Sequence, residues 1–285
     1  MLDYLKTLPQ YFLPQHLLSR LMYAFTRCRV RVWKDAQIRW FIRHYQVDMS
    51  IAQEPDARRY PDFNSFFTRA LAASARPLVN EPGAILCPVD GTVSQIGDIS
   101  AGRIFQAKGH EYSLVQLLGS SPRRAAPFEN GRYATLYLSP KDYHRIHMPL
   151  AGRLREMVYV PGRLFSVNAC TTRVVPRVFA RNERVVCIFD TEAGPMAIVM
   201  VGALFVASME TVWAGAVTPP FGRSIVTWDY SGDSEPLELA RGAELGRFNM
   251  GSTVIVLFGA RHTAWNPALT PDATVRMGQL LGRIV

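Results

Sequence analysis

The chain has 285 residues, of which 48% are hydrophobic and 19% are charged, and its formal net charge is +9. This length suits one large domain or two modest ones, and the composition excludes a mainly disordered protein. The cysteines are far apart and form no C-x-x-C pair, which argues against a zinc knuckle and gives no sign of a disulfide framework. We therefore expect a reducing, cytoplasmic setting.

Positive charge is concentrated near the N-terminus. Residues 1–50 carry eight basic side chains against three acidic ones, so this segment holds +5 of the net charge. Large aliphatic and aromatic residues are interleaved with these charges. One group of them has the spacing that places side chains on a single helix face: Leu17, Leu18, Leu21, Met22 and Phe25.

Residues 1–55 form the predicted membrane-association segment. A basic amphipathic helix lies on a bilayer by combining apolar burial with attraction to anionic headgroups. No run here reaches the ~20 apolar residues needed to span a bilayer, and the layout of a signal peptide is missing. We expect peripheral attachment to an anionic lipid surface, on the cytoplasmic face of the cell membrane. A helical hairpin packed on the protein's own core is the alternative. We expect no nucleic-acid binding, because no motif for it is present.

The remaining residues, 56–285, predict a β-rich catalytic domain. Residues 55–80 have the composition of a linker followed by a short helix. From about residue 84, stretches rich in Val, Ile, Leu and aromatic residues alternate with Gly, Pro, Asn and Asp, which is typical of short strands. The predicted strands include Thr92–Ile99, Arg132–Leu138, Leu154–Val160, Val174–Ala180, Val185–Asp190, Met196–Val201 and Thr253–Phe258.

The fold class follows from this pattern. The uncharged stretch Ala193–Met209 is interrupted by Pro195 and Gly202, which favours buried strands over a spanning helix. Long helices do not alternate with the strands, so a doubly wound parallel sheet is disfavoured. We predict an α+β protein with a mostly antiparallel β body, like a sandwich or barrel, preceded by the N-terminal helical segment.

Three polar clusters lie in otherwise strand-like surroundings. They are Asp90 before a glycine, the pair His144 and His147, and Ser252 after Gly251. Each has an ordinary interpretation, as a turn or as structural histidines. A metal site would need further ligands at recognisable spacing, and the sequence shows none, so no metal is predicted.

Taken together, an Asp, a His and a Ser are the parts of a nucleophile, base and orienting group. Ser252 could attack an external acyl group, as in a hydrolase, or the carbonyl of Gly251, as in a self-processing protein. Gly251 has no side chain to obstruct attack, and the Gly-x-Ser-x-Gly elbow of the α/β-hydrolases is missing around Ser252. A membrane-associated serine hydrolase and a non-enzymatic lipid-surface module remain the alternatives.

Seven ordered segments resemble the phosphatidylserine decarboxylase family, in its bacterial, membrane-associated, pyruvoyl-dependent form. The family commonly has Leu where this chain has Met250, a residue of similar volume. The matching segments are Phe63–Arg69, Pro88–Gly91, Asp142–Pro149, Pro161–Asn168, Asn182–Arg184, Val201–Ala203, and Glu244–Phe248 leading to Gly251–Val254.

The resemblance implies a self-processing proenzyme. Ser252 would attack the Gly251 carbonyl, and the chain would separate into a large subunit (1–251) and a small subunit (252–285). Residue 252 would become a covalently bound pyruvoyl group. By the same resemblance, His147 is the base for this cleavage and Asp90 holds its tautomer.

The resemblance also implies the reaction, which is the decarboxylation of membrane phosphatidylserine to phosphatidylethanolamine and carbon dioxide by a carboxy-lyase of phospholipid biosynthesis. The pyruvoyl carbonyl would serve as an electron sink, and His144 would protonate the resulting carbanion. The family implies a dimer of processed protomers.

Overall fold

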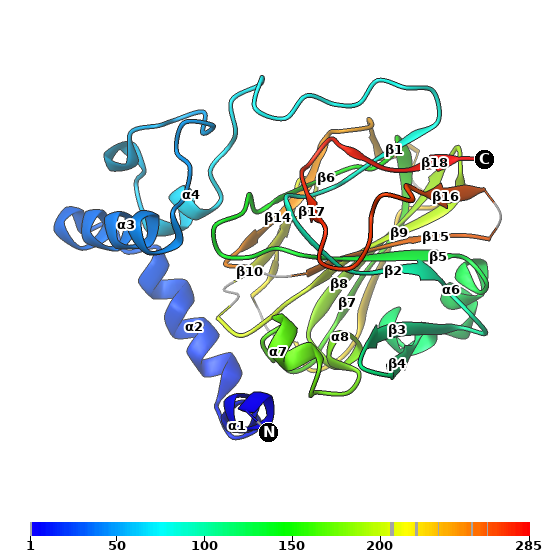
Figure 1. The fold of residues 1–285 in the computed structure, drawn as a ribbon, viewed down its shortest axis with the longest axis horizontal. Coiled ribbons are helices and arrows are strands. Elements are labelled where there is room, and N and C mark those ends of the chain that lie inside the picture. Colours follow the sequence, from blue (N-terminus) through cyan, green and yellow to red (C-terminus); the bar gives the residue numbers. More distant parts are fainter. Residues whose placement is uncertain (1, 206–207, 220–221, 233, 252, 261) are drawn as a thin grey trace.

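The structure, a computed structural model, describes residues 2–205, 208–219, 222–232, 234–251, 253–260 and 262–285. The predicted cofactor precursor, Ser252, lies outside the described residues. N-terminal helices stand beside a β body that holds most of the chain (Figure 1). The predicted α+β class, with a mostly antiparallel body and an N-terminal helical segment, is confirmed.

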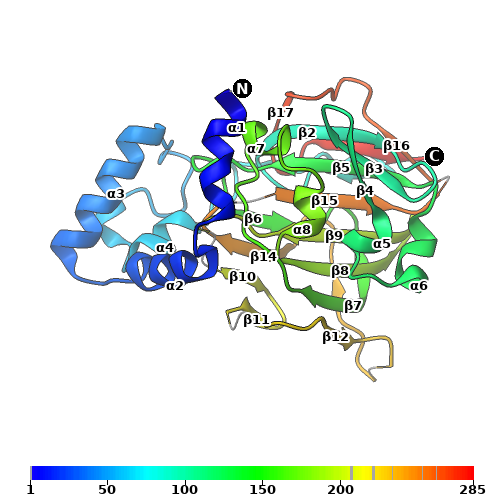
Figure 2. The ribbon, with the colours of Figure 1, turned by 90° about the horizontal axis from the view of Figure 1, so that it is seen from below.

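The N-terminal helices gather on one side of the β body (Figure 2). Within the described residues, no helix combines the length and apolarity needed to cross a bilayer. The helices are α1 (Leu2–Thr7), η1 (Leu8–Tyr11), α2 (Gln15–Thr26) and α3 (Arg31–Tyr45).

Helix α2 confirms the helix predicted from the spacing of Leu17 to Phe25. The side that it buries is the polar one, however, and not the apolar one. Its polar residues Gln15 and Ser19 are buried. Its apolar residues Leu17, Leu21 and Phe25 are 55%, 59% and 44% exposed. The polar side of α2 therefore faces the protein, and its apolar side faces outward.

Helix α3 packs on the short helices η2 (Ala57–Arg59) and α4 (Phe63–Phe67). Phe41 is central, with ring centroids 5.1, 5.9 and 5.8 Å from three Phe rings of α4. This cluster contains residues from both sides of position 55, where the sequence predicted the boundary between the membrane-association segment and the catalytic domain. That boundary stays a prediction. We call it the aromatic cluster; its buried members are Ile38, Phe41, Val47, Tyr60, Phe63, Phe66 and Phe67.

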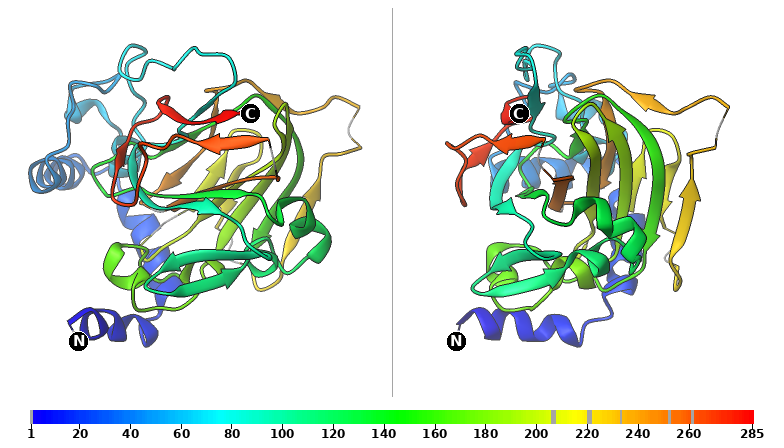
Figure 3. Two further views of the ribbon diagram at one scale, coloured as in Figure 1. Left: turned by 45° about the vertical axis from the view of Figure 1, so that its right-hand side comes forward. Right: turned by 90° about the vertical axis from the view of Figure 1, so that its right-hand side faces the viewer.

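The large sheet of the β body contains strands in the order β12-β7-β8-β9-β15-β5-β2-β17, with β13 beside β7 and neighbours antiparallel. Its strands twist and curve (Figure 3). Strand β15 is a continuous hydrophobic run, buried throughout, as expected for a strand covered on both faces. The strands are β2 (Gly91–Asp98), β5 (Arg132–Tyr137), β7 (Gly152–Val160), β8 (Arg184–Thr191), β9 (Gly194–Val201), β12 (Val226–Asp229), β13 (Glu238–Leu239), β15 (Thr253–Phe258) and β17 (Thr274–Val275).

Smaller sheets complete the body. The first has the order β11-β10-β14-β6, the second β1-β18-β16, and the third pairs β3 with β4. Short helices cover the connections between strands. The bounds are β1 (Ala84–Leu86), β3 (Arg103–Ala107), β4 (His110–Ser113), α5 (Leu114–Leu117), α6 (Pro122–Ala125), η3 (Ala126–Phe128), β6 (Arg145–His147), α7 (Ala169–Thr172), α8 (Val178–Arg181), β10 (Ser208–Thr211), β11 (Gly215–Thr218), β14 (Glu244–Asn249), β16 (Thr263–Trp265) and β18 (Leu280–Ile284).

The strand predicted over Val174–Ala180 is wrong, because this segment forms turns and helix α8. Pro176 has no backbone N–H to donate, and Arg177 has a φ of 58°, outside the extended region. The Gln106 side chain donates to the carbonyl of Val175 at 2.8 Å and accepts from the N–H of Val178 at 2.9 Å. In a sheet, these backbone groups would bond to a neighbouring strand. Val174, Val175 and Val178 are buried in the core although they belong to turns and to helix α8, so their apolar character reflects burial and not a strand.

Candidate active site

The candidate cleavage site lies where the chain crosses between two sheets. Strand β14 pairs with β10 and β6, and the next strand, β15, lies between β9 and β5 in the large sheet. Asn249 ends β14, and Thr253 begins β15 opposite Tyr137 and Val201. Each side of the link is therefore held by its own sheet, independently of the bond between residues 251 and 252.

Met250, in the segment between β14 and β15, has a strained backbone conformation. Its φ is 89°, in the left-handed region that residues with a side chain rarely adopt. Such a conformation costs of order 1–3 kcal/mol and persists only where the surroundings enforce it. The Met250 side chain packs against the aromatic cluster, which supplies part of that enforcement.

His144 lies against the next residue, Gly251. A Cβ added to Gly251 would be 3.4 Å from Nε2 of His144. The ring is fully buried and packs on Phe67, with centroids 4.1 Å apart. Its Nδ1 is 2.8 Å from the carbonyl oxygen of Asp142, which can only accept, so Nδ1 carries the proton.

Nε2 of His144 is consequently a free acceptor. It is buried and has no hydrogen-bond partner among the described residues. Burial lowers the pKa of His144 to about 3, and the nearby Arg69 acts in the same direction. The imidazole is therefore neutral at pH 7, with its unshared electron pair on the nitrogen that faces Gly251.

His147 has both ring nitrogens engaged. Nδ1 donates to the carbonyl oxygen of Gly242 at 2.8 Å, and Nε2 is 2.9 Å from the hydroxyl of Tyr143, which donates to it. Burial lowers the pKa of His147, and Arg145 acts in the same direction. The hydrogen bond to Gly242 and the carboxylates of Glu244 and Asp90 act in the opposite direction. An imidazolium is thus better tolerated at His147 than at His144.

Asp90 is buried and holds an ion pair. Its carboxylate accepts from Nε of Arg76 at 2.9 Å and from the backbone N–H of Met277 at 2.9 Å. The tautomer of His147 is held by the carbonyl of Gly242, while Asp90 contributes its charge to that site. The catalytic roles predicted for Asp90, His144 and His147 stay predictions.

A cavity of about 260 Å³ adjoins Gly251. Phe41 and Tyr45 of α3 form part of its wall, and Ser166 and Asn168 provide polar groups. Sequence reasoning did not single out these four residues. The last two lie within a segment that resembles the family, but nothing in their spacing relates them to position 251. No group of three or more His, Cys, Asp or Glu side chains suited to a metal ion occurs in the described part of the chain.

Comparison with known proteins assigns the family. The model described as phosphatidylserine decarboxylase matches residues 63–283, and one described as PSD matches residues 5–46. The chain belongs to the phosphatidylserine decarboxylase family.

Several relatives are similar over almost the whole chain, and three of them, each bearing the name phosphatidylserine decarboxylase proenzyme, show how far the similarity extends. The relative from Ectopseudomonas mendocina (strain ymp) is 62% identical over 276 residues, covering 96% of this chain and 96% of its own. One from Pseudomonas aeruginosa (strain LESB58) is 62% identical over 95% of this chain and 94% of its own. A third, from Pseudomonas putida (strain GB-1), is 61% identical over 97% and 96%.

Proposed function

We propose that this chain is the proenzyme of a phosphatidylserine decarboxylase, which cleaves itself between Gly251 and Ser252 and converts Ser252 into a pyruvoyl group. The processed enzyme decarboxylates phosphatidylserine to phosphatidylethanolamine. The reaction is that of the family to which the chain belongs. The observation that supports the site is the buried Nε2 of His144, which faces Gly251 and has no hydrogen-bond partner among the residues that the structure describes.

The cleavage converts one peptide bond without any external oxidant. The Ser252 hydroxyl attacks the Gly251 carbonyl, and the amide becomes an ester with a free amine on residue 252. β-Elimination then releases the Gly251 carboxylate and leaves an enamine, which takes up water, loses ammonia and becomes the pyruvoyl group. A serine hydroxyl is a weak nucleophile at neutral pH, so the first step needs a base.

His147 is the proposed base for the cleavage, with Asp90 as its supporting carboxylate. Taking a proton creates an imidazolium, which the charges of Asp90 and Glu244 favour. In this step Nε2 of His147 gives up its hydrogen bond from the Tyr143 hydroxyl and accepts the proton of the Ser252 hydroxyl. His144 is less suited to the role, because full burial and Arg69 both oppose its charged form.

His144 is the proposed proton carrier in the decarboxylation. The site suits a pyruvoyl group at residue 252, because a buried acceptor nitrogen lies against the adjoining Gly251 and has no partner in the described part of the chain. When present, that group supplies an electrophilic carbonyl, which takes up the electrons left by the departing carbon dioxide. Nε2 of His144 can take a proton from the substrate ammonium, which must become a neutral amine to react, and return it to the carbon that has lost carbon dioxide. The imidazolium is short-lived, because burial and Arg69 oppose its charge.

The cavity beside Gly251 is the proposed headgroup site, with Ser166 and Asn168 toward the polar part of the lipid and Phe41 and Tyr45 toward its acyl chains. The exposed apolar side of α2 favours peripheral attachment to an anionic surface, on the cytoplasmic face of the membrane. A dimer of processed protomers is part of the proposal through the family resemblance.

An intact-mass spectrum of the purified protein tests the proposal. We expect two chains, 1–251 and 252–285, the second with a blocked N-terminus that reacts with hydroxylamine. Ser252→Ala should give one full-length chain. A full-length wild-type chain that a fluorophosphonate labels at Ser252 would instead indicate a serine hydrolase, and an intact chain that reacts with neither reagent would indicate a lipid-surface module.

A further inference from the structure

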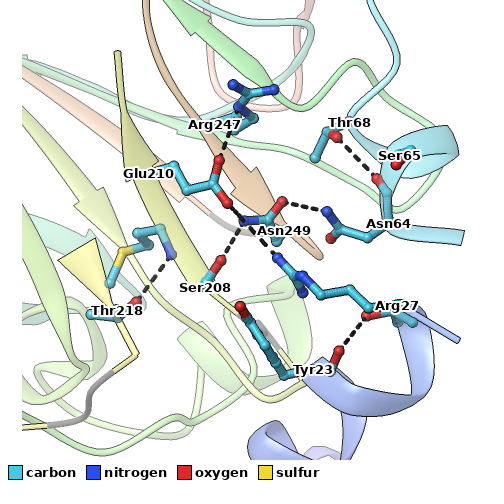
Figure 4. A network of polar contacts seen from close by, with 12 residues as sticks. Tyr23, Arg27, Asn64, Ser65, Thr68, Ser208, Glu210, Thr218, Arg247 and Asn249 are labelled. Carbon is cyan, nitrogen blue, oxygen red and sulfur yellow. Dashed lines mark hydrogen bonds and ion pairs between the residues drawn. The ribbon is translucent and has the colours of Figure 1, made fainter. Parts of the chain in front are cut away.

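Asn249, the last residue of β14, is fully buried at the centre of a polar network, two residues before Gly251 (Figure 4). Its Oδ1 accepts a hydrogen bond from Nδ2 of Asn64 at 2.9 Å. Its Nδ2 donates to Oε1 of Glu210 at 2.6 Å and to Oγ of Ser208. A carboxylate only accepts hydrogen bonds, so Glu210 determines which end of the amide faces it. The Asn249 side chain is thus held in one orientation.

The partners of Asn249 come from different parts of the chain. Ser208 and Glu210 belong to β10, the neighbouring strand, and Asn64 belongs to α4. Arg27, at the end of α2, places Nη2 3.8 Å from Oε1 of Glu210, and its guanidinium lies 3.7 Å from the centre of the Tyr23 ring. The N-terminal helices thereby reach the strand that leads into the cleavage site.

The next residue, Met250, is held from the other side. Its side chain packs against the aromatic cluster of α3 and α4, while its backbone is in the left-handed region. A strained conformation of this kind persists only where the surroundings over-determine it. Asn249 fixes the backbone before the strained residue, and the aromatic cluster fixes its side chain. Both restraints involve the N-terminal 67 residues through α3 and α4.

We propose that Asn249 and its partners Asn64, Ser208, Glu210 and Arg27, together called the Asn249 clamp, position the Gly251 carbonyl for attack by Ser252. The N-terminal helices then take part in self-cleavage as well as in membrane attachment. Asn249 is a positioning residue, because it acts through the backbone of Met250 and Gly251. The inference rests on the proposed function, since the cleavage is the one named there.

The substitution Asn249→Asp tests the clamp, because it keeps the shape of the side chain and replaces the donor that faces Glu210 with an acceptor. Misplacing reacting atoms by about 1 Å costs roughly a hundredfold in rate, so we expect cleavage to slow by roughly tenfold to a hundredfold at pH 8. As the pH falls, protonation of the carboxyl group introduced at position 249 restores a donor to Glu210. The guanidiniums of Arg27 and Arg247, 3.8 and 3.2 Å from the Glu210 carboxylate, favour the charged forms, so this recovery belongs to the acidic end of the pH range. The ratio of variant to wild-type cleavage rate should therefore rise as the pH falls.

A second substitution should restore cleavage at pH 8. Glu210→Gln places an amide donor opposite the new carboxylate, so the double variant has the same hydrogen bond with its direction reversed. Glu210→Gln alone removes the charge that pairs with Arg27 and Arg247, so its own cleavage rate is measured as the reference for the double variant. A role limited to packing would give neither the pH dependence nor the recovery, so failure of both would overturn the proposal.

The controls separate this inference from the proposed function. Asn80→Asp makes the same change at an exposed asparagine and should cleave normally. Each variant is also made with Ser252→Ala, so that the Tm of the uncleaved precursor reports whether it folds. Wild-type chain that does not break at Gly251 refutes the proposed function. Wild-type chain that breaks there, with a folded Asn249→Asp variant cleaving equally fast, refutes only the clamp. If the Asn249→Asp precursor fails to fold, Asn64→Ala replaces it, and wild-type cleavage in that variant overturns the clamp.

Discussion

At the scale of single residues, the environments of the two histidines separate their chemistry. His144 is fully buried, its Nε2 has no hydrogen-bond partner within the described ranges, and burial holds its pKa at about 3. His147 has both nitrogens engaged and carboxylates nearby that favour its charged form. Neither difference is visible in the sequence, where the two residues are only three positions apart.

Substituting each histidine by alanine should separate the two steps. We expect His147→Ala to slow self-cleavage by roughly 10²- to 10⁴-fold, the usual contribution of a general base. His144→Ala should still cleave, but its turnover per cleaved chain should fall by roughly the same factor. Cleavage is followed by gel and mass spectrometry, and turnover by carbon dioxide release. Normal small subunit from His147→Ala, or wild-type turnover from His144→Ala, would remove that residue from its role.

Asp90 and Tyr143 complete the residue-level test. Asp90→Asn keeps the shape and removes the charge that favours the imidazolium of His147, so it should slow cleavage. Tyr143→Phe removes the hydroxyl that occupies Nε2 of His147 and should retain cleavage. If Tyr143→Phe blocks cleavage as fully as His147→Ala, the hydroxyl itself has a part in the chemistry.

Glu183 predicts a pH-dependent stability that is separate from catalysis. This carboxyl group is 2% exposed, and its Oε1 is 2.6 Å from the hydroxyl of Tyr159, which is 3.2 Å from the carbonyl oxygen of Gly222. The shorter contact is the hydrogen bond that the Tyr159 hydroxyl donates to Glu183, and this bond favours the charged carboxylate, against the effect of burial. Burial raises the pKa of Glu183 from 4.5 to about 7.

The sign of the effect follows from linkage. Because the folded state holds the Glu183 proton more tightly than the unfolded state, the contribution of this group to stability is fully present below pH 4.5 and is lost as the pH rises through about 7. The loss amounts to about 3 kcal/mol at most. Glu183→Gln should remove this loss, so urea unfolding between pH 5 and 8 should favour the variant increasingly at higher pH. Glu192→Gln, at an exposed position near the same hairpin, is the control; equal slopes for wild type and Glu183→Gln would contradict the assignment.

At the scale of elements, the position of α2 could be predicted but its orientation could not. Apolar spacing locates the helix, yet the side that meets the protein is polar. Gln15 accepts from the backbone N–H of Leu164 at 2.8 Å, and Gln10 of η1 accepts from that of Ser166 at 2.8 Å. These bonds join residues about 150 positions apart (|i−j| of 149 and 156), which no local pattern encodes.

The same limit applies to the site. The ordered motifs located Asp90, His144, His147 and Gly251, because those residues lie in segments with a recognisable sequence. They did not identify Asn249, whose partner Asn64 is 185 positions away and is specified only by the packing of α4 on the β body. The failed strand at Val174–Ala180 has a related cause, since apolar residues in a loop satisfy the core as well as those in a strand do.

From the outward-facing apolar side of α2 we predict which residues bind the membrane. The triple variant Leu17→Ser, Leu21→Ser, Phe25→Ser removes three exposed apolar side chains, each worth roughly 1.5–3 kcal/mol when buried. Binding to vesicles containing phosphatidylserine should fall by more than roughly a hundredfold in a sedimentation assay, since roughly 1.4 kcal/mol is a factor of ten. Self-cleavage should continue, because Arg27 and the polar side of α2 are unchanged.

A matched control comes from the edge strand β12 and the residue before it. Ile225, Val226 and Trp228 are also exposed, at 43%, 40% and 38%, and changing them to Ser alters apolar exposure on the β body instead. We expect normal vesicle binding from that variant. Loss of binding there, with binding retained in the α2 variant, would move the membrane surface from the helices to the β body.

At the scale of the whole molecule, cleavage should leave the two subunits associated. The small subunit supplies β15 to the large sheet between β9 and β5, β17 beside β2, and β18 beside β1. Strand β15 is buried along its length, so removing it would expose the centre of the sheet to water. The four cysteines all precede position 252, so a disulfide between the two subunits of one chain is excluded.

The association can be followed through Trp265, which belongs to the small subunit. Its Nε1 donates to the backbone carbonyl of Gly97 on β2, at 3.1 Å, so its fluorescence reports contact with the large subunit once the other four tryptophans are changed to Phe. These four are Trp33, Trp40, Trp213 and Trp228. We expect the processed protein to elute as one species under reducing conditions, and Trp265 fluorescence to change together with far-UV circular dichroism in one urea transition. Residues 1–251 expressed alone should aggregate, because the large sheet would lack a central strand. A small subunit that separates on gel filtration without denaturant would show that the peptide bond, and not the interleaved sheets, holds the molecule together.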